Sequence, residues 1–521
     1  MSSHLLLRPL RHHDSTLLTQ STTISSGPSQ ASRREKYRAD QNQVTIGMLP
    51  DDVLVEIFFF YVDVWATGST KWHTLIHVCQ RWRHVVFAYP HHLNLRLVYT
   101  GTRPISEMLD VWPVLPVAII QQLAYTFSKP SLDRTWGNIA TALESEHRTR
   151  ICEINLNPIP TPHWERFAAA MQKPFPELTF LYIWREKNNV TFLPDPFLGG
   201  SAPLLQVLWL GNCAFPGLPK LRLSSNHFVA LFLWDIPHSG YLSPTALCTV
   251  LSVMSRLETL YVGFQSPLSR PDPASRPPPL LTRSVLPALT KIVFRGVHEY
   301  LEDLLAHIEA PSLNRLEITF FMNFDFVVPQ LHQLISRAES FKTFEKAFVY
   351  TSHHAIRFVI FRETPQFPSL SLEIKCTQLD RQLSSLAQVC SSSLHLLSTL
   401  VQLDVVDPVP PNPQSYWTDG VETTQWMELL QPFTAVKDLR LDNQVGLHVC
   451  CALEALAKER VTEVLPALQN IFLGDLQSWI SVPKSIERFT AARQLSGRPV
   501  AVYPWIYREI YERVLLAFSQ D

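Results

Sequence analysis

The chain has 521 residues, which is enough for two or three domains or for one long repeat array. Its 45 Lys and Arg residues nearly balance its 46 Asp and Glu residues, and the formal net charge is -1. This balance excludes binding that depends on a strongly basic surface, such as binding to nucleic acid or to an acidic membrane. The longest apolar runs, residues 57–62 and 114–120, are far shorter than the roughly 20 residues that cross a bilayer. We therefore expect a soluble protein without a membrane or nucleic-acid partner.

Residues 1–45 are rich in Ser, Thr, Gln and Arg, and we interpret them as a disordered tail rather than an organelle transit peptide. The eight cysteines are scattered, without the Cys-x-x-Cys or Cys-x-x-His spacing of a metal site. Reduced thiols indicate a cytoplasmic or nuclear compartment. We interpret the adjacent Cys450 and Cys451 as inert, because neighbouring side chains diverge in a helix-like stretch.

A first helix is predicted to begin at Pro50, where Asp51 and Asp52 place negative charge at the positive end of the helix dipole. Its apolar residues form two stripes on a 3.6-residue period. One stripe comprises Val53, Leu54, Ile57 and Tyr61, and the other comprises Val55, Phe58, Phe59 and Val62. One stripe can face the core of its own block, which leaves the other for a different protein. After a loop at residues 66–70, a second helical stretch is predicted up to Pro90, with a break near Cys79.

The order of these residues resembles the F-box family, whose pattern is Leu-Pro, then an aliphatic-x-x-Ile/Leu-Phe helix, then Val-Cys-x-x-Trp. The resemblance covers residues 46–96 and implies docking onto the small adaptor subunit of a cullin-RING ubiquitin ligase. The adaptor-binding residues that it implies are Leu49, Pro50, Leu54, Ile57, Phe58, Val78 and Trp82. The alternative is an ordinary small helical subdomain that packs on the rest of the chain.

A loose repeat of apolar-x-x-apolar-x-apolar follows a predicted helical linker at residues 97–150. Ten clear copies begin at Ile151, Leu178, Leu205, Phe228, Leu257, Leu289, Leu313, Leu400, Val436 and Leu468. The first seven of these positions are 23 to 32 residues apart, and this spacing resembles leucine-rich repeats. The resemblance implies a fold of class α+β or α/β, in which residues 151–475 form an irregular solenoid with parallel strands on its concave face and helices outside.

Helices are predicted between the strands at residues 244–256, 299–308, 329–338, 382–390 and 425–430. The interval from residue 313 to residue 400 conceals two or three degraded units. Residues 344–349 fit the template, residues 356–361 resemble a strand that pairs back on them, and residues 370–374 fit with one deletion. An inserted hairpin is the alternative for this interval. Residues 476–521 are predicted to cap the array, with a helix at 485–495 and a short strand at 500–502.

Alternate residues of each predicted strand point away from the core, onto the concave face. In the first half these are Phe180, Tyr182, Trp184, Val207, Trp209, Phe232, Trp234, Thr259 and Tyr261. In the second half they are Lys291, Arg295, Arg315, Glu317, Asp404, Asp438, Arg440, Asp442 and Asn470, so the face changes from aromatic to charged. Aromatic residues dominate protein interfaces, and the candidates for binding a client protein are Tyr182, Trp184, Trp209, Phe232, Trp234 and Tyr261. The alternative is that these rings pack under a loop or under the chain's own C-terminal tail.

No Gly-x-Ser-x-Gly, His-Glu-x-x-His, Walker or Gly-x-Gly-x-x-Gly motif occurs in the sequence, so we expect no catalytic residue, metal or cofactor. The overall plan is similar to the expanded F-box families of basidiomycete fungi. It implies a non-catalytic substrate-recognition subunit of a ubiquitin ligase, which binds the adaptor, and through it a cullin, together with an unknown client. A leucine-rich-repeat scaffold or inhibitor without any ligase is the alternative. A hydrolase with dispersed site residues is a third hypothesis that no residue constellation favours.

Overall fold

The computed structural model divides into two compact units, and the predicted tail at residues 1–45 lies outside the residues that it describes. The described residues are 46–63, 72–112, 115–121, 129–186, 192–224, 226–271, 283–321, 326–342, 344–352, 354–361, 368–376, 379–391, 395–406, 423–456, 461–474 and 484–505. The first unit contains the described residues up to Val98 together with the short segment around Trp112, and the second contains most of the remainder. Each unit is described by itself.

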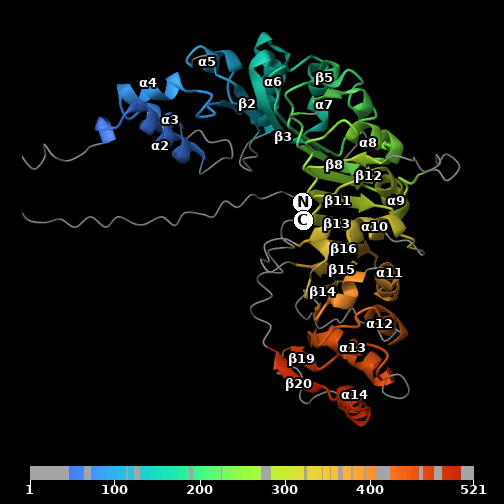
Figure 1. The fold of residues 1–521 in the computed structure, drawn as a ribbon. Helices are drawn as coiled ribbons and strands as arrows, with labels where there is room; N and C mark the ends of the chain where they lie inside the picture. The colour runs from blue at the N-terminus through green and yellow to red at the C-terminus, as the bar shows by residue number, and fades with distance from the viewer. Residues whose placement is uncertain are drawn as a thin grey trace, which may run out of the picture. The chain divides into compact units, whose positions relative to one another are not determined.

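The first unit is a helical block (Figure 1). Its helices are η1 (Ile46–Met48), α2 (Asp51–Asp63), α3 (Trp72–Ile76) and α4 (Gln80–Ala88). The predicted break near Cys79 is confirmed, because the Cys79 side chain caps α4 and its sulfur accepts a hydrogen bond of 3.5 Å from the Trp82 backbone N–H. Helix α4 ends at Ala88, shortly before Pro90, as the sequence predicts. The core of the block consists of Leu54, Val55, Phe58, Trp72, Leu75, Ile76, Val85 and Val86.

The second unit is built on one long sheet, whose strand order is β2-β3-β4-β6-β8-β9-β11-β13-β16-β15-β14-β17-β18-β19-β20. The strands of its first part are β2 (Val117–Ile120), β3 (Ile151–Ile159), β4 (Phe180–Arg185), β6 (Val207–Gly211), β8 (Ala230–Ile236), β9 (Thr259–Phe264), β11 (Lys291–Gly296) and β13 (Arg315–Phe321). The others are β14 (Lys346–Thr351), β15 (Ala355–Ile360), β16 (Leu370–Lys375), β17 (Gln402–Val406), β18 (Asp438–Leu441), β19 (Asn470–Gly474) and β20 (Ala501–Trp505). Each of the ten repeat copies supplies one of these strands, so the predicted array is confirmed.

Helices cover one face of this sheet, and the opposite face is the concave face (Figure 1). They are α6 (Lys129–Glu144), α7 (Thr161–Ala170), α8 (Pro244–Leu251), α9 (His298–His307), α10 (Pro329–Arg337), α11 (Leu379–Ser391), α12 (Thr423–Leu430), α13 (Asn443–Leu456) and α14 (Lys484–Leu495). A further helix, α5 (Ile105–Leu109), precedes β2. All five helices predicted between the strands are therefore present. The mostly parallel strands and the helices outside them make the second unit a leucine-rich-repeat-like solenoid.

Shorter elements complete the connections between strands and helices. Two small parallel sheets pair β5 (Ser201–Ala202) with β7 (Arg222–Leu223) and β10 (Ser284–Val285) with β12 (Ile308–Glu309). Short 3-10 helices are η2 (Glu146–Arg150), η3 (Phe197–Gly200), η4 (Leu218–Lys220), η5 (His238–Gly240), η7 (Glu339–Phe341) and η8 (His395–Thr399). Strand β1 (Leu97–Tyr99) spans the division between the two units.

Alternation along each strand separates the core from the concave face. In β13, Leu316, Ile318 and Phe320 are buried, whereas Arg315, Glu317 and Thr319 between them are partly exposed. This period of two is what a strand imposes on its side chains, and burial of the apolar set fixes the register of each pair.

Among the strands from β2 to β20 whose pairing is described, the interval between β13 and β17 contains the one departure from parallel pairing. Strand β16 pairs in parallel with β13, and β14 pairs in parallel with β17. Strand β15 lies between them and is antiparallel to both β14 and β16. Both hypotheses for this interval are therefore correct in part, because β14 and β16 continue the array and β15 folds back between them.

Residues 97–150, expected as a helical linker, include the two strands β1 and β2 as well as α5 and α6. Strand β2 pairs with β3, so the sheet begins before residue 151. The Val117-Ala118-Ile119 segment is fully buried, as apolar residues of an inner strand are. Val114, Val117 and Ile119 match the spacing of the repeat template, so the sequence contained a signal for this strand that was missed.

The predicted cap is present as α14 and β20, with Ile486 and Phe489 of α14 buried as expected. Its most buried polar group is Arg493, which the sequence did not single out. The Arg493 guanidinium donates hydrogen bonds to the carbonyl oxygens of Val461 (3.1 Å) and Leu468 (3.0 Å), and so ties α14 to the segment that precedes β19. Burial is tolerated because backbone carbonyls replace water as acceptors.

Helix α9 is tied to helix α10 by a half-buried carboxylate. Glu302 of α9 accepts hydrogen bonds from the backbone N–H groups of Gln330 (2.7 Å) and Leu331 (3.0 Å), in the first turn of α10. Helix α10 has no capping side chain of its own, so Glu302 satisfies donors that the helix leaves open. Burial raises the pKa of Glu302 to about 7, although the two N–H donors act in the opposite direction.

Candidate functional site

Helix α2 has one buried and one exposed apolar face. Leu54, Val55 and Phe58 are buried in the block, whereas Val53, Ile57, Phe60 and Tyr61 are exposed. Phe60 is 64 % exposed and Ile57 is 39 % exposed, although both are large apolar side chains. The helix is therefore two-sided, as the sequence predicts, but Leu54 belongs to the buried face and Phe60 to the exposed one.

An arginine fixes the turn that leads into α2. The Arg81 guanidinium on α4 donates to the Leu49 carbonyl oxygen (2.5 Å) and to Asp51 Oδ1 (2.7 Å). These contacts hold the start of α4 against the start of α2. Val78, which lies just before α4, is exposed, as are Met48 and Pro50. The first turn of α2 and the loop before α4 thus carry further exposed apolar groups.

The seven residues implied by the F-box resemblance are distributed over both the core and the surface of the block. Pro50, Ile57 and Val78 are exposed, and Leu49 and Trp82 are half-buried. Leu54 and Phe58 are fully buried, and the Phe58 ring lies 4.7 Å from the Trp82 ring between centroids. Leu54 and Phe58 therefore support the surface from beneath. The exposed Phe60 was missed, and its spacing of three residues from Ile57 was the signal that could have found it.

On the concave face, parallel pairing aligns one aromatic residue from each of four neighbouring strands. Tyr182 of β4 is paired in register with Trp209 of β6, Trp209 with Phe232 of β8, and Phe232 with Tyr261 of β9. We call the row that begins with these four residues the central row. Residues of adjacent strands at the same level are close enough for their side chains to touch.

The rings of all six predicted client-binding residues form one connected cluster. Along the central row, the ring centroids are 3.9 Å apart for Tyr182 and Trp209, 5.5 Å for Trp209 and Phe232, and 6.5 Å for Phe232 and Tyr261. Trp234 stacks on Tyr261 at 4.3 Å, and Trp184 lies 6.2 Å from Trp234. Three of these separations, at 5.5, 6.5 and 6.2 Å, lie in the range of about 4.5 to 7 Å that is typical of favourable aromatic pairs, and the other two are closer. The structure thus brings together every residue of this prediction.

Gly211 allows Trp184 to reach across the sheet. Gly211 of β6 is paired with both Trp184 of β4 and Trp234 of β8. A Cβ atom at Gly211 would lie only 2.3 Å from the Trp184 ring, which is closer than non-bonded atoms can approach. The absence of a side chain at this position therefore lets the indole lie over β6 and approach Trp234.

The tyrosines and Trp209 are enclosed by their neighbours in this cluster. Tyr182 and Tyr261 are buried, and burial raises the pKa of Tyr182 to about 12. The Tyr182 hydroxyl accepts a hydrogen bond of 3.2 Å from the Asn157 side-chain amide. The Trp209 indole N–H has no hydrogen-bond partner in the described part of the chain. This N–H is itself buried, so it is not presented to a partner.

The central row continues in register through every remaining strand of the sheet. Its further members are Val293 of β11, Glu317 of β13, Ser371 of β16, Val359 of β15, Phe348 of β14, Asp404 of β17, Arg440 of β18, Phe472 of β19 and Tyr503 of β20. The predicted change from aromatic to charged is therefore incomplete, because Phe348, Phe472 and Tyr503 place rings in the second half as well. The prediction missed them because it considered only the charged outward positions there.

Two adjacent charged residues lie between rings in this second half. The Arg440 guanidinium lies 5.4 Å from the ring centroids of both Phe472 and Trp505, within the range of cation–π attraction. Asp404, next to Arg440 in the row, is fully buried and accepts a hydrogen bond of 2.8 Å from the Gln402 side-chain amide. Burial raises the pKa of Asp404 to about 6, while Gln402 and Arg440 act in the opposite direction.

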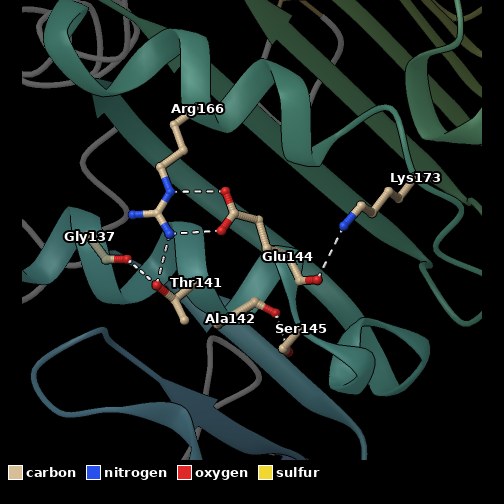
Figure 2. A network of polar contacts seen from close by, with 7 residues as sticks. All are labelled: Gly137, Thr141, Ala142, Glu144, Ser145, Arg166 and Lys173. Carbon is tan, nitrogen blue, oxygen red and sulfur yellow. Dashed lines mark hydrogen bonds and ion pairs between the residues drawn. The ribbon is translucent and has the colours of Figure 1, made fainter.

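A polar network on the helical side of the sheet joins α6 to α7 (Figure 2). Arg166 donates to both carboxylate oxygens of Glu144, at 2.9 and 2.7 Å, and to the Thr141 hydroxyl at 3.0 Å. The hydrogen bond from Arg166 holds the pKa of Glu144 below its usual value. Both partners are substantially exposed and their charges compensate each other, so the network links adjacent helices and offers no reactive group.

The described residues contain no cluster of metal-binding side chains. No group of three His, Cys, Asp or Glu residues there could hold a metal ion. Cys450 is buried and Cys451 is exposed, so their side chains diverge as predicted, and burial raises the pKa of the Cys450 thiol. None of the helices in the described part of the chain has the length and apolar content required to cross a membrane.

No family model matches the chain, and no curated protein matches it. Among solved structures, it is similar to the leucine-rich-repeat-containing protein LegL7 from Legionella pneumophila, with 13% sequence identity and a TM-score of 0.23. The match covers 78% of this chain and 98% of that one. A likeness at this level says nothing about shared partners. The assignment of the second unit to a leucine-rich-repeat-like solenoid rests on its repeats and on its strand pairing.

Proposed function

We propose that the chain is the substrate-recognition subunit of a cullin-RING ubiquitin ligase. In this proposal the helical block is an F-box that binds the adaptor subunit, and the concave face of the solenoid binds the client protein. The observation that carries it is the exposed apolar face of α2, formed by Val53, Ile57, Phe60 and Tyr61. A patch of large apolar side chains on a soluble protein is typical of a protein-binding surface.

The order of the F-box residues supports a specific partner for this face. Arg81 fixes Leu49 and Asp51 at the start of α2, and exposed Ile57 follows two turns later. Leu54 and Phe58 pack beneath and keep the exposed side chains in place. The chain itself would perform no chemistry. It would raise the effective concentration of client lysines at an enzyme supplied by the complex.

The aromatic cluster supports the client-binding role of the solenoid. Trp and Tyr bury large areas with little loss of side-chain freedom, and six such rings are gathered on one side of the sheet.

Capture of purified adaptor subunit by the full chain tests the ligase proposal. Ile57→Asp places a charge on the exposed face of α2 and is expected to weaken adaptor binding at least about tenfold, as expected for a charge buried without a partner. Val253→Asp is the matched control. Val253, like Ile57, is an exposed β-branched apolar residue (56 % exposed), but it lies in the solenoid, just after α8. It should bind adaptor like the wild type. Equal adaptor binding by both variants, with unchanged thermal unfolding, would contradict the proposal.

A scaffold or inhibitor without a ligase is the second candidate function. The same concave face favours it, since the aromatic cluster does not depend on the helical block for its ring contacts. Failure of the full chain to retrieve any adaptor, with a client still bound through Trp209 and Phe232, would favour this candidate over the first.

A further inference from the structure

The aromatic cluster ends beside a group of cations. After Tyr261, the next member of the central row is Val293 of β11, and this strand also carries Lys291 and Arg295 on the concave face. Arg315 follows on β13, where it is paired in register with Lys291. The apolar row therefore continues for five strands, from Tyr182 to Val293, and positive side chains flank its far end.

The carboxylates near these cations are less exposed than the cations themselves. The Arg295 side chain is 27 % exposed, whereas its partner Asp235, at 3.0 Å, is 5 % exposed. Lys375 is 43 % exposed, and its partner Glu373, at 3.9 Å, is 18 % exposed. Because the carboxylates lie beneath and the cations above, the surface presented to a partner is more positive than the pairing suggests.

The region at the far end of the apolar row also carries a net positive charge. Its cations are Lys291, Arg295, Arg315, Arg357 and Lys375, and its carboxylates are Asp235, Glu317 and Glu373. Five positive and three negative groups leave a net charge of about +2, from 5 minus 3. Glu317 is shared between Lys291 (3.3 Å) and Arg315 (2.6 Å), so one carboxylate compensates for two cations. We call these five cations the cationic group.

We propose that the concave face binds an acidic peptide segment, in which a stretch of apolar side chains is followed by Asp or Glu residues. The apolar stretch would lie on the rings from Tyr182 to Tyr261, and its carboxylates would meet the cationic group. The proposal rests on the proposed client-binding role and adds to it the chemistry of the partner. Charge complementarity selects this occupant over a basic segment, which the same group would repel.

The dimensions of the row set the length of the segment. Neighbouring strands are about 4.8 Å apart, so the four steps from β4 to β11 span about 19 Å. An extended peptide covers this distance in about six residues, since it rises about 3.3 Å per residue. The acidic residues are therefore expected within the next three or four positions, where β13 and β16 supply their cations.

Selection from a phage-displayed library of random twelve-residue peptides tests the proposal on the full chain. Three proteins are compared with the wild type. Lys291→Gln with Arg315→Gln removes charge from the cationic group, and Phe232→Ser removes one ring of the central row. Lys220→Gln is the matched control. Lys220 lies in η4, outside the long sheet, and forms an exposed ion pair with Asp195. Thermal unfolding checks that each variant is folded.

The wild type is expected to enrich peptides with aromatic or aliphatic residues followed by Asp or Glu. Binding of the enriched peptide, measured by fluorescence anisotropy, should weaken about tenfold in the Lys291→Gln, Arg315→Gln variant and should then depend less on salt. Phe232→Ser should abolish it, and Lys220→Gln should leave it unchanged. Enrichment without acidic residues, no enrichment at all, or wild-type affinity in the charge variant would overturn the proposal.

The result also separates this inference from the proposed function. Loss of acidic selection with retained binding through Phe232 would reject the partner's chemistry while leaving client binding on the aromatic cluster intact. Adaptor capture that is insensitive to Ile57→Asp would reject the ligase role, whatever peptides the solenoid selects.

Discussion

The two halves of the concave face share one geometry and differ in chemistry. In both, each strand contributes one residue to the central row, and the row remains in register even across antiparallel β15. From β4 to β9 every member is an aromatic residue, whereas from β14 to β20 the adjacent charges Asp404 and Arg440 lie between Phe348 and the rings of Phe472 and Tyr503. Strand pairing therefore decides which residues meet, and residue type alone decides whether they form an apolar surface or a polar one.

The largest expected effect on stability comes from replacing a glycine with alanine, and each half of the concave face has a glycine for this comparison. Gly211→Ala would place a Cβ atom 2.3 Å from the Trp184 ring, and the indole would have to leave β6. We expect the free energy of unfolding to fall by about 2 to 3 kcal/mol, as for overpacking of a filled core. Chemical denaturation measures the loss, and tryptophan fluorescence reports the displaced ring.

The matched substitution in the second half is Gly474→Ala. The nearest atom to a Cβ there is Asp442 Oδ1, at 3.1 Å, and a small side-chain shift can relieve the contact. Its effect should remain within about 0.5 kcal/mol. Equal effects of the two alanines would mean that the first half is no more tightly packed than the second.

A second, smaller effect is expected at the helices behind the middle of the sheet, where the two halves meet. Burial raises the pKa of Glu302 from 4.5 to about 7, so the folded state holds its proton more tightly than the unfolded state. This contribution to stability is fully present below pH 4.5 and is lost as pH rises to about 7. Glu302→Gln abolishes this titration.

Denaturation of the wild type and of Glu302→Gln at several pH values measures the effect. The stability of the variant relative to the wild type should increase by about 1 to 2 kcal/mol between pH 5 and pH 8. A difference that does not change with pH would show that Glu302 keeps an ordinary pKa, despite its contacts with Gln330 and Leu331.

The smallest expected loss of stability is at Arg440, a cation that packs against two rings. Arg440→Lys retains the charge but loses the planar group that lies over Phe472 and Trp505. The expected cost is about 0.5 to 1 kcal/mol, in line with a partly exposed cation–π contact. Arg166→Lys, at an exposed ion pair with Glu144, is the reference and should cost no more than about 0.5 kcal/mol. Equal losses would remove any special role for the stacked guanidinium.

The sequence predicts the aromatic cluster because alternation in a strand assigns each residue to one face. Tyr182, Trp209 and Phe232 occupy alternate positions next to buried leucines, and parallel pairing then places them side by side. The same pattern predicts the ten strands of the array. It does not predict which ring touches which, since Trp184 reaches Trp234 only because Gly211 lies between them.

Helix α2 shows where such reasoning is less decisive. A helix that is apolar nearly all round has no polar edge wide enough to define its orientation. Leu54 was therefore grouped with residues that are exposed, and the exposed Phe60 was assigned to neither stripe. The direction of β15 was equally ambiguous, because an alternating pattern reads the same in a parallel and an antiparallel strand. Arg493 was not predicted as buried, because its acceptors are backbone carbonyls that leave no trace in the sequence.

The reversed strand β15 also limits how the array can change in length. In a uniform solenoid each unit contacts only its neighbours, so duplication or deletion of one unit rejoins equivalent edges. Strand β15 is antiparallel to its partners on both sides, so β14, β15 and β16 form a three-strand cassette from which no single strand can be removed without breaking the pairing. Recombination can therefore lengthen or shorten the gene on either side of this cassette, but a crossover within it leaves two strand edges of incompatible polarity.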